Sequence, residues 1–218
     1  MSDRPKNEEE LQRLEAIGVI RASRFVRKYA QSHERVTMET VFEIHRSIFQ
    51  DAWPEIAGKT RTVELKITDS EHHPPHHIHV PGLIKEASDE LDMRISGIRS
   101  TESFWLRGGD LSEEQMIMGD KVVEVAAWLH HKITFIHPFQ DGNGRTARLA
   151  ANLVLECYGL VGISIKVERE NKNRYRLALA QVDKMNDLEP LKALIYEGLI
   201  DRISGIPMFF DGKSKHSL

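Results

Sequence analysis

The sequence predicts a mainly α-helical protein that carries one small β-hairpin. Apolar residues recur at helical spacing along most of the 218-residue chain, which is long enough to bury a core as one compact domain. Signals for a helix start occur at Thr37 and at Ser112, where Gln115 completes a capping box. Residues 61–67, by contrast, alternate apolar and polar side chains, as a strand does.

The N-terminal part is expected to hold two helices. The first begins at Glu8 and is weakened midway by Gly18, so one bent helix and two short helices both fit the pattern. Thr37 caps the second helix. We expect residues 1–36 to form an N-terminal helical extension and residues 37–200 to form the main domain.

The segment at about residues 61–80 is expected to fold as a hairpin. Its first strand places Val63, Leu65 and Ile67 on one face, and an extended return passes Ile78 before Pro81 starts another helix. An exposed strand edge of this kind could pair with an extended peptide of another protein.

Five histidines fall within eight residues of this hairpin, namely His72, His73, His76, His77 and His79. Such a cluster could bind zinc or nickel. No cysteine accompanies the histidines, however, and the adjacent prolines disturb regular ligand geometry. A role in docking or pH sensitivity, or simple tolerance of histidines in an exposed loop, also fits the pattern.

The C-terminal half is expected to contain four helices. The long helix from Ser112 carries apolar residues up to Ile136 and leads into a glycine-rich loop. Residues 146–156 form the next helix, which should turn four residues toward the core: Ala147, Ala150, Ala151 and Val154. A third helix starts near Glu170, and the closing helix ends at Ile200. Residues 201–218 are expected to form a loosely attached tail.

The loop between the first two of these helices carries the chemistry. The segment reads His137-Pro-Phe-Gln-Asp-Gly-Asn-Gly-Arg-Thr-Ala-Arg148. Its two Asx-Gly pairs favour positive φ and close approach of a ligand. Because the loop opens onto a helix N-terminus, unpaired N–H groups and the helix dipole would create an anion site. Arg145 and Arg148, three residues apart, should lie on one side of the first turn.

Four residues of the loop would turn this anion site into a reaction centre. His137 titrates near neutral pH and could accept a proton from a hydroxyl group. Asp141 is a hard carboxylate suited to Mg²⁺. Asn143 could donate a hydrogen bond to a phosphate oxygen, while Phe139 could anchor the loop as an apolar plug.

The segment resembles the signature of the Fic (filamentation induced by cAMP) domain family, His-Pro-Phe-x-(Asp/Glu)-Gly-Asn-Gly-Arg-x-x-Arg, at every fixed position. The resemblance, of the protein adenylyltransferase type, implies a Fic-fold helical bundle with a β-hairpin flap beside the active site. It also implies transfer of AMP from ATP to a Ser, Thr or Tyr hydroxyl of a target protein, with release of pyrophosphate.

The resemblance also implies a role for each residue of the loop. His137 would be the catalytic base, and Asp141 would hold Mg²⁺. The nucleotide and its phosphates would bind through Phe139, Gly142, Asn143, Gly144, Arg145 and Arg148. Tyr175, in a later helix, could pack against adenine or could equally be a core tyrosine.

A second segment, residues 45–61, is also similar to the family. It contains the pattern His-x-x-(Leu/Ile)-Phe…Trp…Ala-Gly-x-x-Arg, in which an Ala-Gly turn leads toward the flap. In that family the flap, here with Val63, Leu65, Ile67 and Ile78, docks the target.

Many family members are inhibited by a helix glutamate that pairs with the second arginine of the signature. Its pattern, (Ser/Thr)-x-x-x-Glu-(Gly/Asn), has no full match here. Glu15 lies in a suitable N-terminal helix without the flanking residues, and Glu197 matches only at the end of the pattern. Glu15 is the better candidate for autoinhibition. A separate antitoxin chain, no inhibitor, or simply two solvated glutamates remain alternatives.

The composition of the sequence limits which partners and which cellular compartment we expect for this protein. The formal net charge of −3 gives no basic field that would favour nucleic acid. The single cysteine, Cys157, is expected to pack in the core rather than act as a nucleophile. No apolar run approaches the ~20 residues of a membrane span, and the N-terminus does not read as a signal peptide. We therefore expect a cytoplasmic protein, with a homodimer as one option.

Three other functions remain open from the sequence. The phosphate site does not distinguish bases, so another donor such as UTP is compatible with it. The reverse reaction, removal of AMP, would require a glutamate to position water. A non-catalytic module that binds nucleotide or metal would need neither His137 nor Asp141.

Overall fold

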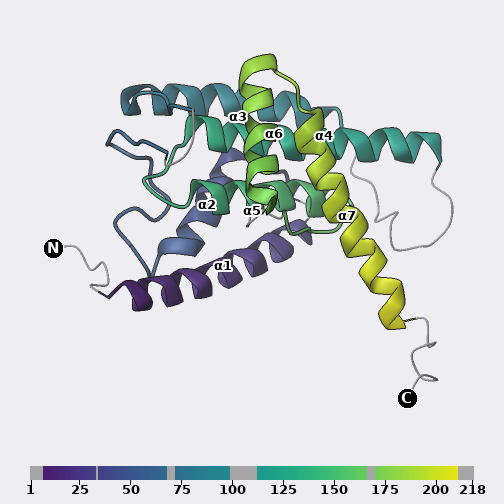
Figure 1. Ribbon diagram of the computed structural model, residues 1–218, viewed down its shortest axis with the longest axis horizontal. Helices are drawn as coiled ribbons and strands as arrows, with labels where there is room; N and C mark the ends of the chain where they lie inside the picture. Colours follow the sequence, from purple (N-terminus) through teal and green to yellow (C-terminus); the bar gives the residue numbers. More distant parts are fainter. Residues whose placement is uncertain (1–6, 33, 68–71, 99–111, 166–169, 211–218) are drawn as a thin grey trace.

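The computed structural model describes residues 7–32, 34–67, 72–98, 112–165 and 170–210 (Figure 1). The helices are α1 (Glu8–Ala30), α2 (Met38–Phe49), the short 3₁₀ helix η1 (His77–His79), α3 (Val80–Ser96), α4 (Glu113–Ile136), α5 (Asn143–Cys157), α6 (Glu170–Met185) and α7 (Glu189–Phe210). None of the helices in these ranges combines the length and apolarity needed to cross a bilayer.

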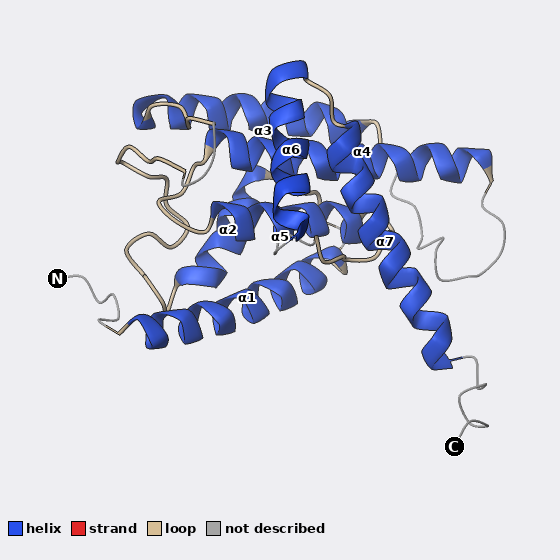
Figure 2. Cartoon of the chain, viewed as in Figure 1, coloured by secondary structure: helices blue, strands red, loops and turns tan. Residues whose placement is uncertain are grey.

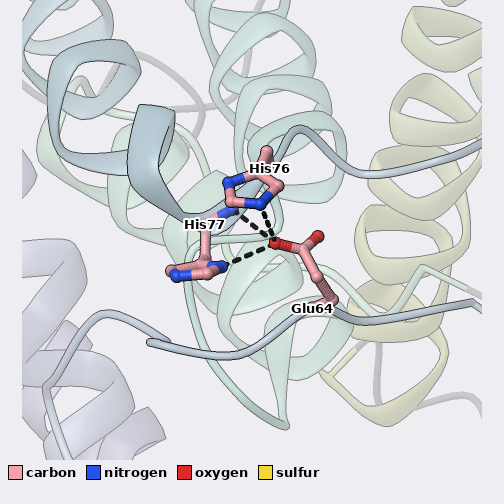
Figure 3. A group of neighbouring side chains, drawn as sticks. All are labelled: Glu64, His76 and His77. Atoms are coloured by element: carbon pink, nitrogen blue, oxygen red, sulfur yellow. Dashed lines mark hydrogen bonds and ion pairs between the residues drawn. The ribbon is translucent and has the colours of Figure 1, made fainter.

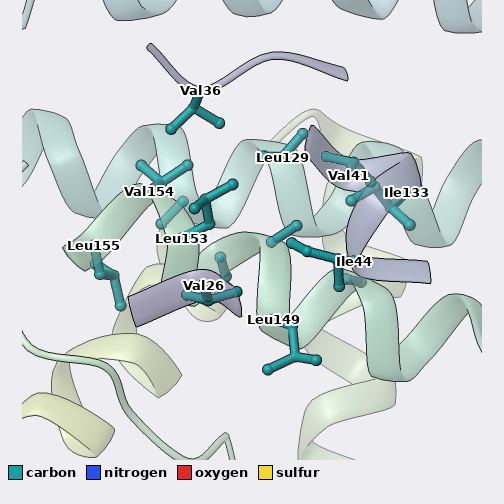
Figure 4. Packing of buried hydrophobic residues seen from close by; sticks show 14 of the residues in the cluster. Val26, Val36, Val41, Ile44, Leu129, Ile133, Leu149, Leu153, Val154 and Leu155 are labelled. Atoms are coloured by element: carbon teal, nitrogen blue, oxygen red, sulfur yellow. The ribbon is translucent and has the colours of Figure 1, made fainter. Parts of the chain in front are cut away.

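Helices α4 and α5 form the centre of the bundle. The middle of α4 is buried on all sides, α5 is buried along much of its length, and α5 returns along α4 below it in Figure 1. Side chains from α1, α2, α4 and α5 meet in the core, among them Val26, Ile44, Leu129 and Leu153 (Figure 4). The core residues predicted for α5 are confirmed: Ala147, Ala150, Ala151 and Val154 are fully buried.

Two predicted helix starts are confirmed by reciprocal capping bonds. The Ser112 Oγ accepts the Gln115 N–H at 3.2 Å, and the Gln115 side chain accepts the Ser112 N–H at 2.8 Å. Thr37 forms the same arrangement with Thr40. Each pair satisfies backbone donors that the first helical turn leaves without partners.

Helix α1 is one uninterrupted helix, although the sequence also allowed two short ones. Gly18 lies where α1 crosses α2: a Cβ there would come within 1.9 Å of the Ile48 carbonyl oxygen. The glycine therefore permits close helix packing instead of breaking the helix. Leu11, Ala22 and Val26 of α1 belong to the same core as the central helices.

Helix α7 continues to Phe210, so the predicted helix end at Ile200 was wrong. Residues 201–210 of the predicted tail are helical, and residues 211–218 lie outside the described part of the chain.

The predicted β-hairpin is not formed within the described residues, where helices and loops are the only elements (Figure 2). The backbone of residues 61–67 is irregular, and residues 68–71 lie outside the described ranges. On the return side, Pro74 and Pro75 have no N–H to donate, so a regular hydrogen-bonded ladder is interrupted there. The mainly α-helical prediction is confirmed, and the hairpin is not.

Candidate active site

The loop between α4 and α5 turns sharply at two residues with left-handed backbone. His137 has φ 52° and ψ 57° and ends α4, while Gly142 has φ 74° and precedes the first residue of α5. A Cβ at Gly142 would lie 2.2 Å from the Phe49 ring, so glycine is required there for space as well as for conformation. Both turns bring the ends of α4 and α5 together.

The buried Phe139 side chain anchors the loop. The fully buried Phe139 ring stacks on the His45 ring with centroids 3.8 Å apart, and its edge meets Phe42. His45 Nδ1 accepts the Gly58 N–H at 2.9 Å, so the proton of the neutral ring lies on Nε2, which donates to the Asp141 carbonyl at 3.0 Å. Burial lowers the pKa of His45 to about 4, which keeps the ring neutral.

Asn143 closes the loop on itself. Its side-chain oxygen accepts the Phe139 N–H at 2.9 Å, and its amide donates to the Phe139 carbonyl at 2.7 Å. The Asn143 residue is only 2% exposed. In this arrangement Asn143 shapes the loop, and Phe139 is the anchor expected of it. Direct contacts of these two residues with a nucleotide stay predictions.

The His137 ring is oriented by one backbone contact. Its Nδ1 lies 3.2 Å from the Thr134 carbonyl oxygen, which can only accept, so this nitrogen carries the proton of the neutral ring. Burial lowers the pKa of His137, the positive charge of Arg61 lowers it further, and the contact with Thr134 opposes the shift. The Nε2 atom is therefore left to accept a proton.

The start of α5 offers backbone donors to an anion. Gly142 caps the helix without a side-chain hydrogen bond, and the first-turn N–H groups have no intrahelical acceptor. The helix dipole adds partial positive charge at the same end. At Gly144 a Cβ would meet only Arg148, at an ordinary distance of 3.5 Å, and the residue lines the pocket described below.

The two loop arginines contact different neighbours. Arg145 forms an ion pair with Glu15 of α1, stacks its guanidinium over the Phe49 ring at 5.0 Å, and donates to Asp141 Oδ1 at 3.3 Å. Arg148 lies by Gly144 and partly offsets the effect of burial on the pKa of Tyr175.

The ion pair places α1 against the loop. The Glu15 side chain is 15% exposed and that of Arg145 is 26% exposed, so both are largely removed from water. The partner is the first arginine of the motif, whereas the resemblance implied the second. Glu197 instead pairs with Arg174 of α6, so the structure does not bring it to the loop.

Asp141 is half exposed at the outer side of the loop. Its Oδ1 accepts the Gly142 N–H as well as the Arg145 bond. No bond to Oδ2 is found in the part of the chain that the structure describes. A carboxylate with one such oxygen has the donor chemistry that Mg²⁺ prefers.

A pocket of about 720 Å³ opens beside the loop. His137, Gly144 and Tyr175 line it, together with Ile67 and His72 from the predicted flap and Asp183 from α6. The Tyr175 hydroxyl lies 3.3 Å from His130 Nε2, and burial raises its pKa to about 12. Tyr175 is thus both packed against α4 and available to a ligand in the pocket.

Arg61 is a site residue that the sequence reasoning did not single out. It is 3% exposed, its Nε donates to the His137 carbonyl at 2.7 Å, and its backbone N–H donates to the Pro138 carbonyl at 2.8 Å. The same guanidinium donates to the carbonyls of Val63 and Pro75. Arg61 and His45 both lie in the second segment that resembled the family, and that was the signal for them.

The predicted docking residues are not equivalent in the structure. Val63 is 42% exposed and Ile78 is 69% exposed, whereas Leu65 and Ile67 are half-buried. Cys157 is also half-buried, and burial raises the pKa of its thiol to about 12, which agrees with packing rather than nucleophilic chemistry.

Comparison with known proteins agrees with this geometry. The model of the Fic/DOC family matches residues 35–155. The chain is 31% identical over 159 residues to the protein adenylyltransferase Fic of Nematostella vectensis, a match that covers 72% of this chain and 32% of that protein. A uridine 5'-monophosphate transferase of Xanthomonas campestris is 30% identical over 149 residues, covering 64% of this chain and 24% of that protein.

Solved structures show the same fold. The C. elegans Fic-1 structure superposes with a TM-score of 0.66 at 25% identity, covering 98% of this chain and 55% of that chain. A Fic domain-containing signaling protein of Bacteroides thetaiotaomicron superposes with a TM-score of 0.65 at 26% identity, covering 89% of this chain and 70% of that chain. The chain spans about a third of the length of the curated relatives it matches. The family model covers more than half of the sequence, so the chain belongs to the Fic/DOC family.

Proposed function

We propose that this protein is a protein adenylyltransferase, which transfers AMP from ATP to a Ser, Thr or Tyr hydroxyl of a target protein and releases pyrophosphate. The observation that carries the proposal is that His137 and the N-terminal turn of α5 border one pocket. A proton acceptor and a phosphate-binding turn are what transfer of a phosphate-linked group to a hydroxyl requires. The relatives named protein adenylyltransferase support it.

In the proposed reaction, His137 Nε2 takes the proton of the target hydroxyl. The hydroxyl oxygen then forms a bond to the α-phosphorus of ATP, and the bond between that phosphorus and the leaving oxygen of pyrophosphate breaks. Backbone N–H groups at Gly144 and its neighbours stabilise the charge on the phosphate oxygens, as does Arg148. Tyr175 would pack against the base from α6.

Asp141 is the residue that would hold Mg²⁺, because its half-exposed carboxylate is a hard ligand beside the phosphate-binding turn. When bound, the ion would neutralise charge on the phosphates. Arg145 would contribute to the same task once it is free of Glu15.

The predicted flap would present the target hydroxyl. Exposed apolar side chains at Val63 and Ile78 are suited to contact an extended peptide, and Ile67 reaches the pocket wall. Leu65, half-buried between them, would support this surface. An antitoxin chain, a homodimer and a cytoplasmic setting stay predictions.

Glu15 would act as an intramolecular inhibitor. Its carboxylate forms an ion pair with the Arg145 guanidinium, which would otherwise bind a phosphate group. ATP would then have to compete with a largely buried ion pair.

The transfer reaction is tested by incubating the purified chain and a cell lysate with Mg²⁺ and either α-³²P-ATP or γ-³²P-ATP. We expect protein to be labelled from the α position and not from the γ position. The His137→Ala variant should lose the label by orders of magnitude, because no base remains. The matched control is His79→Ala, since His79 makes no side-chain capping bond and does not line the pocket.

Label from the γ position would show phosphate transfer instead and would contradict the proposal. Equal labelling by His137→Ala would also contradict it. Nucleotide binding without label from either position would favour a non-catalytic module.

UTP should be tested as the donor in the same experiment, because one relative is named a uridine 5'-monophosphate transferase. Labelling from α-³²P-UTP in preference to α-³²P-ATP would identify this chain as a uridylyltransferase.

A further inference from the structure

Three side chains of the predicted flap converge on one point (Figure 3). Glu64 comes from the first side of the segment, and the neighbouring His76 and His77 come from the second. Glu64 Oε1 lies 3.2 Å from His76 Nε2 and 2.6 Å from His77 Nδ1. All three potential ligand atoms lie within 4.8 Å of one another.

The backbone holds both histidine rings on the same side. His76 is extended, with φ −54° and ψ 138°, and His77 begins the 3₁₀ helix η1. The two rings stack with centroids 4.5 Å apart, so each turns a nitrogen toward the carboxylate. The His77 N–H also donates to Glu64 Oε1, at 3.1 Å. The arrangement therefore exists before any ion binds.

Both histidines approach the same oxygen of the Glu64 carboxylate. Hydrogen bonds from the His77 side chain and backbone lower the pKa of Glu64. A cation could replace the ring protons at the same position.

We propose that Glu64, His76 and His77 form a binding site for a divalent transition-metal ion of the Zn²⁺ class. Two imidazole nitrogens and one carboxylate oxygen are ligands that zinc accepts, whereas Mg²⁺ prefers oxygen alone. Three protein ligands leave one tetrahedral position for water. All three side chains are partly exposed, so an ion can enter from solvent.

The spacing of the ligand atoms is close to what zinc requires. Tetrahedral bonds of about 2.0–2.1 Å place neighbouring ligand atoms roughly 3.3 Å apart. The pair between His76 Nε2 and Glu64 already has this separation, and the His77 contact must lengthen by roughly 0.7 Å. A rotation of exposed side chains is sufficient for that change.

Metal binding has one specific cost. His76 Nδ1 now accepts the Ile78 N–H at 3.3 Å. When Nε2 binds the ion, the remaining ring proton must move to Nδ1, and the Ile78 N–H loses its acceptor. His77 would bind through the opposite nitrogen, Nδ1. The two neighbouring histidines would thus use different ring atoms.

The ion would connect the two segments of the predicted flap that lie beside the pocket, one with Glu64 and the other with His76. Arg61 already joins the carbonyls of Val63 and Pro75. The metal would add a second connection one residue further on each side, from Glu64 to His76. Ile67 and His72, which lie between these ties in the sequence, line the pocket. The ion would act on the shape of the rim, and its binding does not depend on the proposed transfer reaction.

The site is tested by titrating the full chain with Zn²⁺ by calorimetry and with Co²⁺ as a visible-absorption probe. We expect one ion per chain and a tetrahedral Co²⁺ spectrum. Glu64→Gln and His76→Gln should each weaken Zn²⁺ binding more than about tenfold. His79→Gln is the matched control, because His79 belongs to the same histidine run but not to the cluster, and it should bind as the unaltered chain does.

Equal weakening by His79→Gln would overturn the site, because it would show diffuse binding to the histidine run. Loss of the ion with Asp141→Asn, but not with Glu64→Gln, would move it to the catalytic loop and would also overturn the site. Imidazole ¹⁵N spectra provide an independent check: we expect coordination of His76 through Nε2 and of His77 through Nδ1. Any other pair of nitrogens would contradict the assigned geometry.

Discussion

The proposed chemistry depends on the left-handed backbone conformation of His137, because that conformation positions its ring. A non-glycine residue in the left-handed region costs on the order of 1–3 kcal/mol and persists only where its surroundings hold it. Here the His137 N–H donates to the Ile133 carbonyl, and the His137 carbonyl accepts from Arg61. These bonds end α4 abruptly and turn the ring into the pocket.

The lowered pKa of His137 predicts the acidic limb of the pH–rate profile. A general base acts in its neutral form, so activity should be lost as the pH falls through its pKa. Burial and the charge of Arg61 lower that pKa below the ordinary 6.5. We therefore expect the acidic limb of kcat/KM for AMP transfer to have its midpoint below pH 6.5. A midpoint at or above 6.5 would contradict the burial argument.

Arg61→Lys should impair the site although the charge is kept. A lysine ammonium cannot match the planar guanidinium that joins the carbonyls of His137, Val63 and Pro75. We expect kcat to fall about tenfold or more, since small displacements of catalytic groups have large effects on rate. Initial rates of label transfer measure this.

The control for that variant is Arg46→Lys, whose side chain is half exposed and pairs with Glu43 on the same helix. It should change the rate and the free energy of unfolding little. Equal losses in both variants would show that Arg61 has no special role.

At the scale of helices, Gly18 determines how closely α1 and α2 can pack. By propensity, glycine in a helix is unfavourable by about 1 kcal/mol relative to alanine, and for that reason Gly18 suggested a break. Its packing role outweighs the propensity, because the absent side chain leaves room for the Ile48 carbonyl. Helical periodicity on either side then continues undisturbed.

Gly18→Ala should destabilise the protein although it improves helix propensity. The added methyl would overlap a backbone carbonyl that cannot rotate away, and such overpacking costs about 1–3 kcal/mol. Gly82→Ala in α3 is the control, since no atom lies within 4 Å of its Cβ position. It should be neutral or stabilising by up to about 1 kcal/mol. Urea unfolding measures both, and a stabilising Gly18→Ala would refute the packing argument.

At the scale of the whole molecule, α1 belongs to the core and to the site together. Leu11, Ala22 and Val26 anchor the helix in the bundle, and this anchoring holds Glu15 against Arg145. The family model begins at residue 35, after this helix. The predicted boundary between an extension at 1–36 and a main domain at 37–200 stays a prediction, with α1 packed on that domain.

Glu15→Gln should raise the rate of AMP transfer without unfolding the protein. The change removes the carboxylate charge that holds Arg145, so ATP phosphates no longer compete with it. A coupling of 1–3 kcal/mol corresponds to about a 5- to 150-fold rise in kcat/KM. Glu10→Gln, on the exposed part of the same helix, is the control and should leave the rate unchanged. A rate that stays equal or falls in Glu15→Gln would show that the ion pair is structural only.

Many structural features of this protein follow from residues that are close together in the sequence. Some predicted features depend only on residues within one or two turns, and the structure confirms them. They are the helix starts at Thr37 and Ser112 and the buried alanines of α5. The loop residues from His137 to Arg148 were found for the same reason, because they are contiguous. Local physics is sufficient for such features.

The tertiary structure decided the partners of those residues. Only helix packing brings Glu15 to Arg145 across 130 positions. The hairpin was predicted from alternation alone, but a strand also needs a partner with donors, which Pro74 and Pro75 cannot provide. Glu64 likewise meets His77, 13 positions further along the chain, and periodicity does not encode that contact. Contacts between distant residues depend on how whole elements pack, and that information is not contained in any single stretch of sequence.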